Sequence, residues 1–427
     1  MGQMTWAQFK RAVQTRFGTL EEADACGTVS KLRKIGTVKE YQLQFERFNS
    51  QLNPALAKQC GCKITSTDQF KVTVRDGGVI NSSGKCYNVP VNIQVSDDTT
   101  TILADASAVG GWFNANIGAI GTRKVTLDPE LVVAEANPQV ITVRQDGTGN
   151  FKKINDAIKS IPSGNTRRVI IWIGAVEYQE KITIEHTKPF VTFYGSPNAM
   201  PTITQSGTAL QYGTVDSATI IIESNYFVAA NIIFKSGDHA LALRTSGTKA
   251  AIYKCKVLRF QDTLCDDNGL HFFWDCYIEG MVDFIFGRGK SIYLNTQLHV
   301  LRDKDITVIM AQARDSLAED VGYLFVHCQV TEAGKRTYLG KAWMSYPRVV
   351  FAYTSMTNVV LPVAWDENAR PERRQTVYFA KYKCNGAKAN IDGRAKFSKK
   401  LTDAEVQPFL TLGYIQGSKW LIPPPRL

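Results

Sequence analysis

The sequence is short of several features that define other classes of protein. No apolar run reaches the 18 residues or more that a membrane-spanning helix needs. The first 30 residues contain no hydrophobic stretch followed by a small-residue cleavage site, which predicts that no signal peptide is present. Nine cysteines in 427 residues are too few for a disulfide scaffold. The one tight pair, Cys60 and Cys62, is followed by no partner at zinc-finger spacing, so no metal site is expected.

The composition is that of a globular protein with an excess of positive charge. Hydrophobic residues make up 44% and charged residues 21% of the chain, which excludes a disordered, collagenous or coiled-coil protein. The formal net charge is +11. It fits either a solvated basic surface or an anionic polymer as partner, nucleic acid or acidic polysaccharide, and the sequence leaves both open.

The pattern of apolar residues divides the chain into four parts. Residues 4–50 carry helical periodicity. Residues 64–96 alternate between apolar and polar side chains around a turn signal, which predicts a β-hairpin or a small sheet. Residues 97–138 have the composition of a linker with one short helical piece. Residues 139–425 are rich in short β-type runs separated by turn residues, so the chain is expected to be mainly β.

A weak internal repeat runs through the β-rich part. Four segments share a small polar or thiol residue between apolar neighbours, and they align on Asn231, Cys255, Cys276 and Thr296 with spacings of 20 to 24 residues. Short strands at this period are typical of a solenoid, in which each turn buries its apolar face against the next. The repeat therefore predicts a parallel β-helix.

The same repeat places two carboxylates in one register. Asp262 lies seven residues after Cys255, and Asp283 lies seven residues after Cys276. Equivalent residues on successive turns stack at about 4.8 Å, so the two charges should raise one pKa, as in an acid/base and nucleophile pair. Gln261 adjoins Asp262, and His239 is expected near the same site one turn earlier. The alternative is that both aspartates are loop residues that accept hydrogen bonds from local backbone.

Residues 140–425 resemble the catalytic domain of plant pectinesterases, a family of right-handed, single-stranded parallel β-helices. The matching blocks occur in the family's order: residues 140–151, Glu177–Glu180, Phe260–Leu264 (FQDTL), Asp275–Gly280 (DCYIEG), Asp283–Gly287 (DFIFG) and Leu339–Trp343 (LGKAW). The resemblance implies hydrolysis of galacturonate methyl esters in pectin, in cell wall modification and pectin catabolism, with no metal or organic cofactor. It also implies pectin and proteinaceous pectinesterase inhibitors as partners, and an extracellular, cell-wall location that the missing signal peptide puts in question.

Carried over residue by residue, the resemblance assigns roles within the predicted site. Asp283 resembles the nucleophile, Asp262 the general acid/base and Gln261 an oxyanion-hole donor. Trp343 and Trp365 resemble the aromatic residues that pack on the sugar chain.

Two positions of the predicted site depart from the family pattern. His239 stands where the family has glutamine, and Lys341 stands where it has an arginine that pairs with the nucleophile. A lysine keeps the charge but loses the two-pronged geometry of a guanidinium. Impaired activity is therefore an expected consequence, and a catalytically inactive pectin-binding β-helix is one alternative reading.

The N-terminal part resembles something unrelated. Residues 4–50 are similar to a retrotransposon gag fragment, and residues 64–96 to a truncated retroelement aspartic protease without the Asp-Thr-Gly or Asp-Ser-Gly triplet that catalysis needs. A fused or mispredicted gene would explain this arrangement. It leaves a retroelement-derived nucleic-acid or assembly protein as a second alternative, although nucleic acid is not the expected partner.

Overall fold

The computed structural model describes two separate parts of the chain. They are residues 63–73 and 79–87, for which the backbone is described, and the stretch from Ile117 to Leu427, without residues 118–122, 124, 208, 238–239, 260–261, 302–306, 333–335, 390–391 and 426. The contacts group the chain into two compact units, Met1–Val95 and Ser96–Leu427. Within the described residues, no helix is long and apolar enough to cross a membrane.

The first unit contains a β-hairpin. Strand β1 (Lys63–Thr73) pairs antiparallel with β2 (Val79–Tyr87), and the register shifts between Thr65 and Gln69. The hairpin predicted within residues 64–96 is confirmed for the strands Lys63–Thr73 and Val79–Tyr87. The predicted helical segment 4–50 and residues 88–96 lie outside the described residues.

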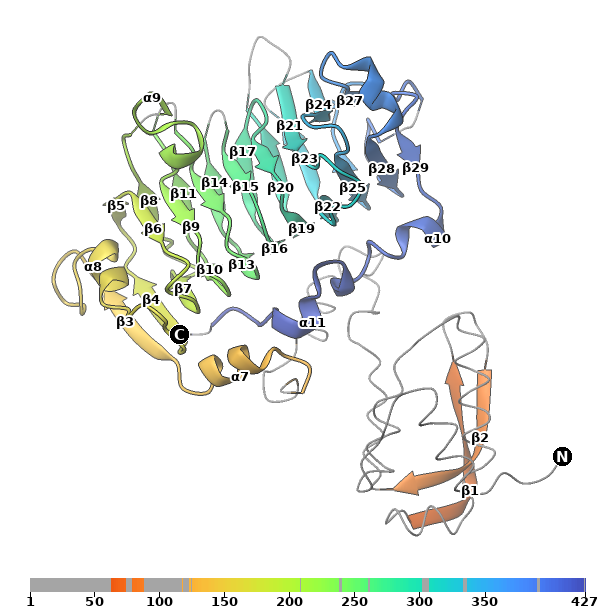
Figure 1. Cartoon of the computed structure of the whole chain (residues 1–427), viewed down its shortest axis with the longest axis horizontal. Helices are drawn as coiled ribbons and strands as arrows, with labels where there is room; N and C mark the ends of the chain where they lie inside the picture. The colour runs from red at the N-terminus through yellow and green to blue at the C-terminus, as the bar shows by residue number, and fades with distance from the viewer. Residues whose placement is uncertain are drawn as a thin grey trace. The chain divides into compact units, whose positions relative to one another are not determined.

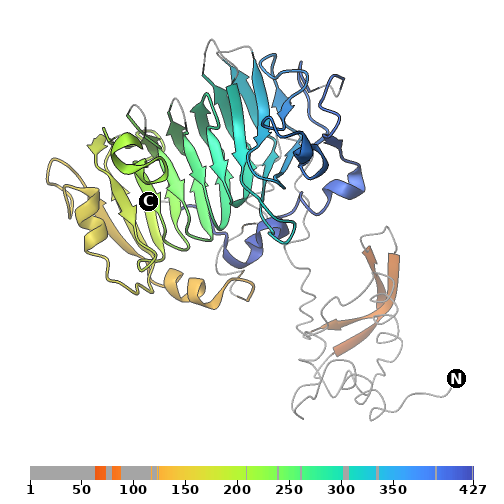
Figure 2. The same ribbon diagram turned by 45° about the horizontal axis from the view of Figure 1, so that its top comes forward.

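The second unit is a parallel β-helix of three sheets (Figures 1 and 2). The first sheet contains β3 (Gln139–Val143), β4 (Val169–Ile173), β7 (Val191–Tyr194), β10 (Val228–Ala230), β13 (Ala250–Tyr253), β16 (Leu270–Trp274), β19 (Lys290–Leu294), β22 (Gly322–Val326), β25 (Arg348–Ala352), β28 (Tyr378–Tyr382) and β29 (Lys399–Lys400). The second contains β5 (Glu177–Gln179), β8 (Thr202–Thr204), β11 (Ile233–Lys235), β14 (Lys256–Leu258), β17 (Tyr277–Gly280), β20 (Gln297–Val300), β23 (Gln329–Glu332) and β26 (Ser355–Met356). The third contains β6 (Ile182–Ile184), β9 (Ile220–Ile222), β12 (Leu243–Thr245), β15 (Leu264–Asp266), β18 (Ile285–Gly287), β21 (Thr307–Gln312), β24 (Thr337–Ala342) and β27 (Trp365–Asp366).

Each middle coil crosses the three sheets in turn, and every strand pairs in parallel with the equivalent strand of the next coil. The predicted parallel β-helix is therefore confirmed. The helical segments are short: α7 (Pro129–Glu135), α8 (Ile154–Lys159), α9 (Ala209–Tyr212), η3 (Val215–Ser217), η4 (Pro371–Gln375), α10 (Asp403–Val406), η5 (Leu412–Ile415) and α11 (Gly417–Trp420). Of these, α7 lies in the segment 97–138 that was interpreted as a linker.

The turn between the first and second sheets explains the repeat. A residue with left-handed φ ends the first strand of many coils, for example Lys254 (51°), Asp275 (56°) and Asn295 (51°). The next side chain points inward and donates a hydrogen bond to the carbonyl two residues earlier. These contacts are 3.3 Å from Cys255 Sγ to Tyr253, 3.4 Å from Cys276 Sγ to Trp274 and 3.3 Å from Thr296 Oγ1 to Leu294. Each of these carbonyls also accepts a backbone N–H from the preceding coil, so the small side chain fits the inward position and adds a second hydrogen bond at this turn.

One coil of the sequence alignment was wrong by a single residue. Ile233 pairs with Lys256, so Ile232 is the equivalent of Cys255. Asn231, which the repeat had matched to Cys255, is instead the left-handed turn residue, with φ of 58°. Asparagine tolerates that conformation better than a β-branched residue does, which is why the polar residue sits one position earlier here.

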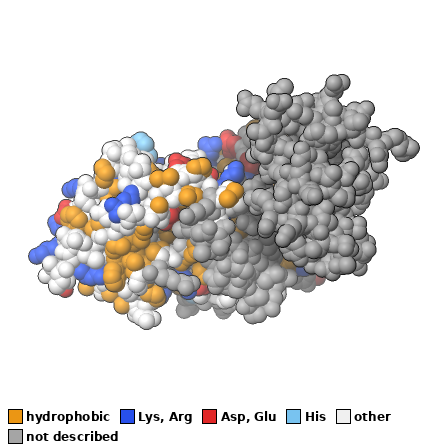
Figure 3. Space-filling view, turned by 90° about the horizontal axis from the view of Figure 1, so that it is seen from below, with side chains coloured by type: hydrophobic (Ala, Val, Ile, Leu, Met, Phe, Trp, Pro, Cys, Tyr) orange, Lys and Arg blue, Asp and Glu red, His pale blue; other side chains and the backbone are white. Residues whose placement is uncertain are grey.

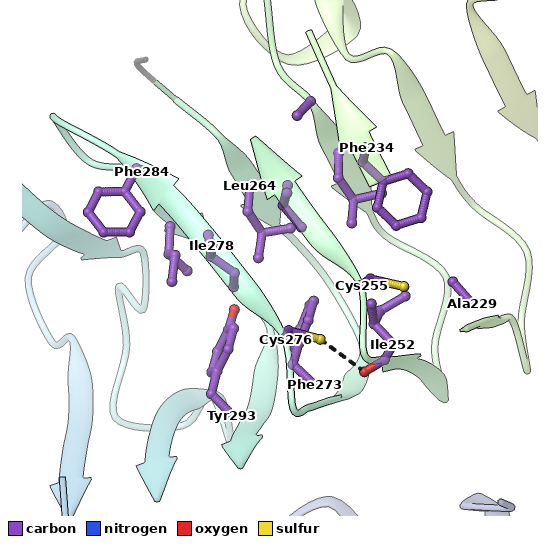
Figure 4. Close-up of a cluster of buried hydrophobic side chains, with 14 of the residues drawn as sticks. Ala229, Phe234, Ile252, Cys255, Leu264, Phe273, Cys276, Ile278, Phe284 and Tyr293 are labelled. Carbon is purple, nitrogen blue, oxygen red and sulfur yellow. Dashed lines mark hydrogen bonds between the residues drawn. The ribbon is translucent and has the colours of Figure 1, made fainter. Parts of the chain in front are cut away.

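The interior is filled by stacked side chains from successive coils. Phe273, Tyr293, Phe325 and Phe351 form a continuous stack with ring centroids 4.5, 4.6 and 4.5 Å apart. Figure 4 shows part of this core, including Leu264 and Ile278, which are fully buried. Burial of such a large apolar side chain contributes about 1.5–3 kcal/mol, so each coil is stabilised chiefly by contact with its neighbours.

The C-terminal tail and α7 cover the outer face of the first sheet. Arg123 donates from Nη1 to the carbonyl of Leu421 over 2.6 Å, and the Tyr253 hydroxyl donates to the carbonyl of Ile422 over 2.6 Å. Lys249 forms an ion pair with Asp128 at 2.8 Å. Seen from this side, hydrophobic side chains gather among scattered lysines and arginines (Figure 3).

A buried polar cluster joins the third sheet to the first. Asp266, at the end of β15, has no exposed surface. Its Oδ1 lies 2.5 Å from His271 Nδ1, and its Oδ2 accepts a hydrogen bond of 2.6 Å from the Tyr293 hydroxyl. Its backbone carbonyl accepts 2.8 Å from the Tyr323 hydroxyl. The cluster thus ties β15 to β16, β19 and β22 across the interior.

This cluster yields a prediction about stability. Tyr293→Phe keeps the ring stack but leaves Asp266 Oδ2 without its donor, so we expect it to lower the free energy of unfolding by about 1–3 kcal/mol in urea titrations. The matched control is Tyr277→Phe, which removes a hydroxyl that donates 2.9 Å to Glu279 in a half-buried position. Equal losses for the two variants would show that the Asp266 cluster has no special importance.

Candidate active site

Asp262 and Asp283 occupy equivalent positions on adjacent coils. Leu264 pairs with Ile285, and each aspartate precedes its paired residue by two positions. The Asp262 amide donates 3.4 Å to the carbonyl of Val282, which keeps the two coils together at this point. The predicted register is therefore confirmed. Both aspartates also have left-handed backbone, with φ of 49° and 48°, a conformation that is unfavourable for most side chains and collects at functional sites.

The two carboxyl groups are partly buried, and both have raised pKa values. Burial is the main cause for Asp262, and the negative charge of Asp283 raises its pKa further, against the opposing charges of Arg259 and Lys341. Burial also raises the pKa of Asp283, while the hydrogen bond and charge of Lys341 act in the opposite direction. The acidic Asp366 adds to the rise at Asp283. The ammonium of Lys341 contacts Asp283 directly, so Asp283 is the aspartate of the pair that is favoured to ionise.

Lys341 holds only one oxygen of Asp283. Its ammonium forms an ion pair with Asp283 Oδ2, and both side chains are about four-fifths buried. Asp283 Oδ1 is buried and accepts no hydrogen bond from the described residues. An ammonium is a compact point charge, whereas a guanidinium could reach both oxygens of a carboxylate. The carboxyl of Asp283 is therefore restrained at one atom and not at two.

A row of outward-facing side chains passes this pair along the helix axis. Cys265, Phe286, Ala311, Lys341 and Asp366 are paired in register on β15, β18, β21, β24 and β27. A row of this kind has the direction that an extended polymer would follow if it lay along the solenoid.

Phe286 of this row contacts Trp343, which follows β24. The two rings meet edge to face with centroids 5.9 Å apart, and Trp343 is 37% exposed. Phe286 was missed by the sequence reasoning. The signal was present in the alternation of β18, where Ile285 faces the core and the next residue must face outward.

Trp365 lies elsewhere, although its sequence position is close to that of Trp343. Its side chain is 1% exposed and stacks on Phe379 with centroids 4.4 Å apart. A ring in this core position has no surface for a sugar, so the sugar contact predicted for Trp365 is contradicted. The remaining two predicted site residues, Gln261 and His239, lie outside the described residues.

The described residues offer no group of three or more His, Cys, Asp or Glu side chains that could hold a metal ion. The site brings together two carboxyl groups and one ammonium. Asp283, beside a cation, suits attack as an anion. Asp262, which is buried and lies near a second negative charge, suits transfer of a proton.

Comparison with known proteins identifies similar sequences and structures. The family model described as pectinesterase matches residues 140–418. Over 343 residues the chain is 50% identical to probable pectinesterase 50 of Arabidopsis thaliana, covering 78% of this chain and 95% of the relative. It is 48% identical over 345 residues to pectinesterase 1 of Olea europaea, with 78% and 94% covered. The solved structure of the pectin methylesterase from carrot superimposes with a TM-score of 0.63 at 28% identity, covering 67% of this chain and 95% of that one.

The raised pKa of Asp262 predicts how stability changes with pH. Because the folded chain holds this proton more tightly than the unfolded chain, stability falls as the pH rises from the ordinary carboxyl range through the raised pKa. Asp262→Asn should therefore raise the melting temperature at neutral pH. At about pH 3 it should change the melting temperature little, because the Asp262 carboxyl is protonated there and neither side chain carries a charge. Thermal unfolding across the pH range measures this difference.

Asp275→Asn is the matched control, because Asp275 also has a left-handed φ but is exposed. We expect no pH-dependent gain from it. A gain for Asp262→Asn that is the same at every pH would mean that the Asp262 charge is not the source of the effect.

Proposed function

The chain belongs to the pectinesterase family, and on that basis we propose that it is a carboxylic ester hydrolase that removes methyl groups from galacturonate in pectin. The products are methanol and de-esterified pectin. The observation that carries the proposal is the pair Asp262 and Asp283, in register on adjacent coils and differing in their contact with Lys341.

The proposed reaction begins with the ionised Asp283. Its carboxylate attacks the C6 carbonyl carbon of a methyl-esterified galacturonate, and Gln261 donates a hydrogen bond to the oxyanion that forms. As the C6–O bond to the methoxy group breaks, the protonated Asp262 gives its proton to the departing methanol. An acyl-enzyme anhydride between Asp283 and the sugar carboxyl remains.

Hydrolysis of this anhydride completes the cycle. Asp262, now ionised, takes a proton from water, and the resulting hydroxide attacks the sugar C6 carbonyl. The bond to Asp283 breaks and releases the galacturonic acid, which loses its proton to solvent, while Asp262 is protonated and Asp283 is ionised again as at the start. The raised pKa of Asp262 suits a group that must give a proton and then accept one.

The aromatic pair Trp343 and Phe286 is proposed to line the sugar-binding groove. The C–H face of a pyranose ring is apolar and packs on an aromatic surface, and Trp343 is the exposed member of the pair. Lys341 is proposed to orient Asp283, and His239 to stand in for a glutamine donor near the oxyanion.

A second candidate function is a pectin-binding β-helix with little or no catalysis. The unpaired Asp283 Oδ1 favours it, because a nucleophile held at one oxygen can rotate away from the productive direction. A retroelement-derived nucleic-acid or assembly protein has no such support from the described residues. We propose that the gag-like segment 4–50 and the protease-like segment 64–96 take no part in ester hydrolysis.

The location and protein partners are further parts of the proposal. Because the proposed substrate is a polysaccharide of the plant cell wall, the β-helix is proposed to act there, with proteinaceous pectinesterase inhibitors as partners that cover the groove.

The direct test of the function is methanol release from highly methyl-esterified pectin by the purified chain. We expect release that is abolished in Asp283→Ala, because that variant lacks the attacking carboxylate. Binding of the same pectin with no methanol release above that of Asp283→Ala would instead establish the pectin-binding alternative.

The two departures from the family pattern give a prediction of repair. Lys341→Arg should hold both oxygens of Asp283, and His239→Gln should supply a neutral amide donor, so each should raise kcat by about ten-fold or more with little change in melting temperature. The double variant need not show the product of the two effects, since both act on one reacting centre. A double variant no faster than the parent would place the defect elsewhere.

A further inference from the structure

Most of the excess positive charge lies in one short stretch of the chain. Residues 370–400 contain ten lysines and arginines and only two acidic residues, whereas the whole chain has 50 basic and 39 acidic residues. This stretch comprises η4, β28, β29 and the segments that connect them at the C-terminal end of the solenoid. A local excess of this size attracts polyanions over about a Debye length.

Part of this charge is exposed and without acidic partners. Lys396, Lys399 and Lys400 are exposed and form no ion pair with any described residue. Two other cations of the stretch are paired at the surface, Lys383 with Asp403 and Arg374 with Glu367. The three unpaired lysines lie together on the last strand of the first sheet and just before it.

Three further cations of the stretch, Lys381, Lys388 and Arg394, line or support a hollow at the end of the solenoid. The hollow has a volume of about 210 Å³ and is lined by Pro362, Ala387, Lys388, Asp392 and Arg394. Arg394 donates from Nη1 to the carbonyls of Leu361 and Pro362 over 2.9 and 2.7 Å, and its Nε is buried without an acceptor among the described residues.

Lys381 lies behind the hollow, is 8% exposed and donates to the carbonyl of Ala389. Burial, and then the charge of Arg394, lowers the pKa of Lys381. Lys381 contacts a backbone carbonyl, and Arg394 contacts backbone carbonyls and Met356 Sδ. Asp392 in the lining supplies one negative charge against the three positive charges of Lys381, Lys388 and Arg394. An anionic group would therefore be favoured here.

The basic stretch is continuous with the sugar-binding groove. Arg373, in η4, donates from Nη1 to the carbonyls of Ala342 and Trp343 over 2.5 and 2.9 Å. The row of outward side chains ends at β27, the last strand of the third sheet. A polymer that lies along this row and continues past Trp343 therefore meets η4, where Arg370 and Arg374 are exposed.

We propose that the described lysines and arginines of the stretch 370–400 form a second binding surface, which holds de-esterified homogalacturonan. The proposal rests on the proposed function, because hydrolysis of the esters creates one carboxylate per sugar and so turns a neutral polymer into a polyanion. The surface distinguishes the product stretch of the polymer from the uncharged, methylated stretch. Binding at this surface keeps the protein on a pectin molecule whose esters it has already hydrolysed.

A polyuronate fits this surface better than a nucleic acid does. Binding of single-stranded nucleic acid uses exposed aromatic side chains on which bases stack. In this stretch Phe379 and Tyr382 are buried, and Tyr378 is covered by the ammonium of Lys399, 4.7 Å from its ring centroid. The described part of the surface thus offers charge but no stacking platform.

The test compares the triple variant Lys396→Gln, Lys399→Gln and Lys400→Gln with a matched control, Lys152→Gln, Lys153→Gln and Lys159→Gln. The control lysines are also exposed but lie at α8, at the other end of the solenoid (Figure 1). Affinity for fully de-esterified polygalacturonate is measured by calorimetry at several salt concentrations. We expect the triple variant to bind about ten-fold more weakly at low salt, with a shallower salt dependence, because each exposed ion pair adds a few-fold.

Other outcomes would overturn the proposal. They are unchanged affinity in the triple variant, an equal loss in the α8 control, or binding of a single-stranded DNA of the same charge as tight as that of polygalacturonate. Affinity for fully methylated pectin should be the same in all three proteins. Methanol release from a short methylated oligomer is measured separately, so absence of catalysis would reject the proposed function without deciding the binding result.

Discussion

In-register stacking of the coils is the constraint on which the rest of the structure depends. Adjacent strands in all three sheets pair in parallel, so a residue's position within its coil fixes its neighbours in the coils before and after. Asp262 and Asp283 meet because their strands start at the same point, and Phe286 and Lys341 belong to one outward row for the same reason. A shift of one residue would turn each of these side chains to the other face.

The fold could be predicted largely because this constraint is written into the sequence as a repeat. The small donors Cys255, Cys276 and Thr296 recur because each takes the same inward position and adds a hydrogen bond to a carbonyl at the same turn. The repeat misled at Asn231, where a polar residue tolerates the left-handed conformation and an isoleucine takes the inward position. Spacing alone does not distinguish a residue at the left-handed turn position from the next residue, whose side chain points into the core.

The site was predicted less completely than the fold, and the tryptophans show why. Trp343 follows β24 and Trp365 lies in the neighbouring strand β27. The two residues have the same chemistry, but one is exposed beside Phe286 and the other is stacked on Phe379 in the core. The direction of a side chain at the end of a short strand depends on packing across coils, which local sequence does not reveal. The one-sided contact of Lys341 with Asp283 could likewise be anticipated from residue type, but the buried, unpaired Oδ1 is visible only in the structure.

The C-terminal tail has a consequence for how the solenoid comes into being. Its last residues bind Arg123 and Tyr253, which lie before the first coil and in a middle coil respectively. During synthesis the coils emerge in order from the N-terminal end, and each can pack on its predecessor as soon as it appears. The outer face of the first sheet, however, keeps its apolar surface open until the final residues leave the ribosome. The last segment to be made is thus the one that closes the structure, and until then the nascent chain is most exposed to aggregation.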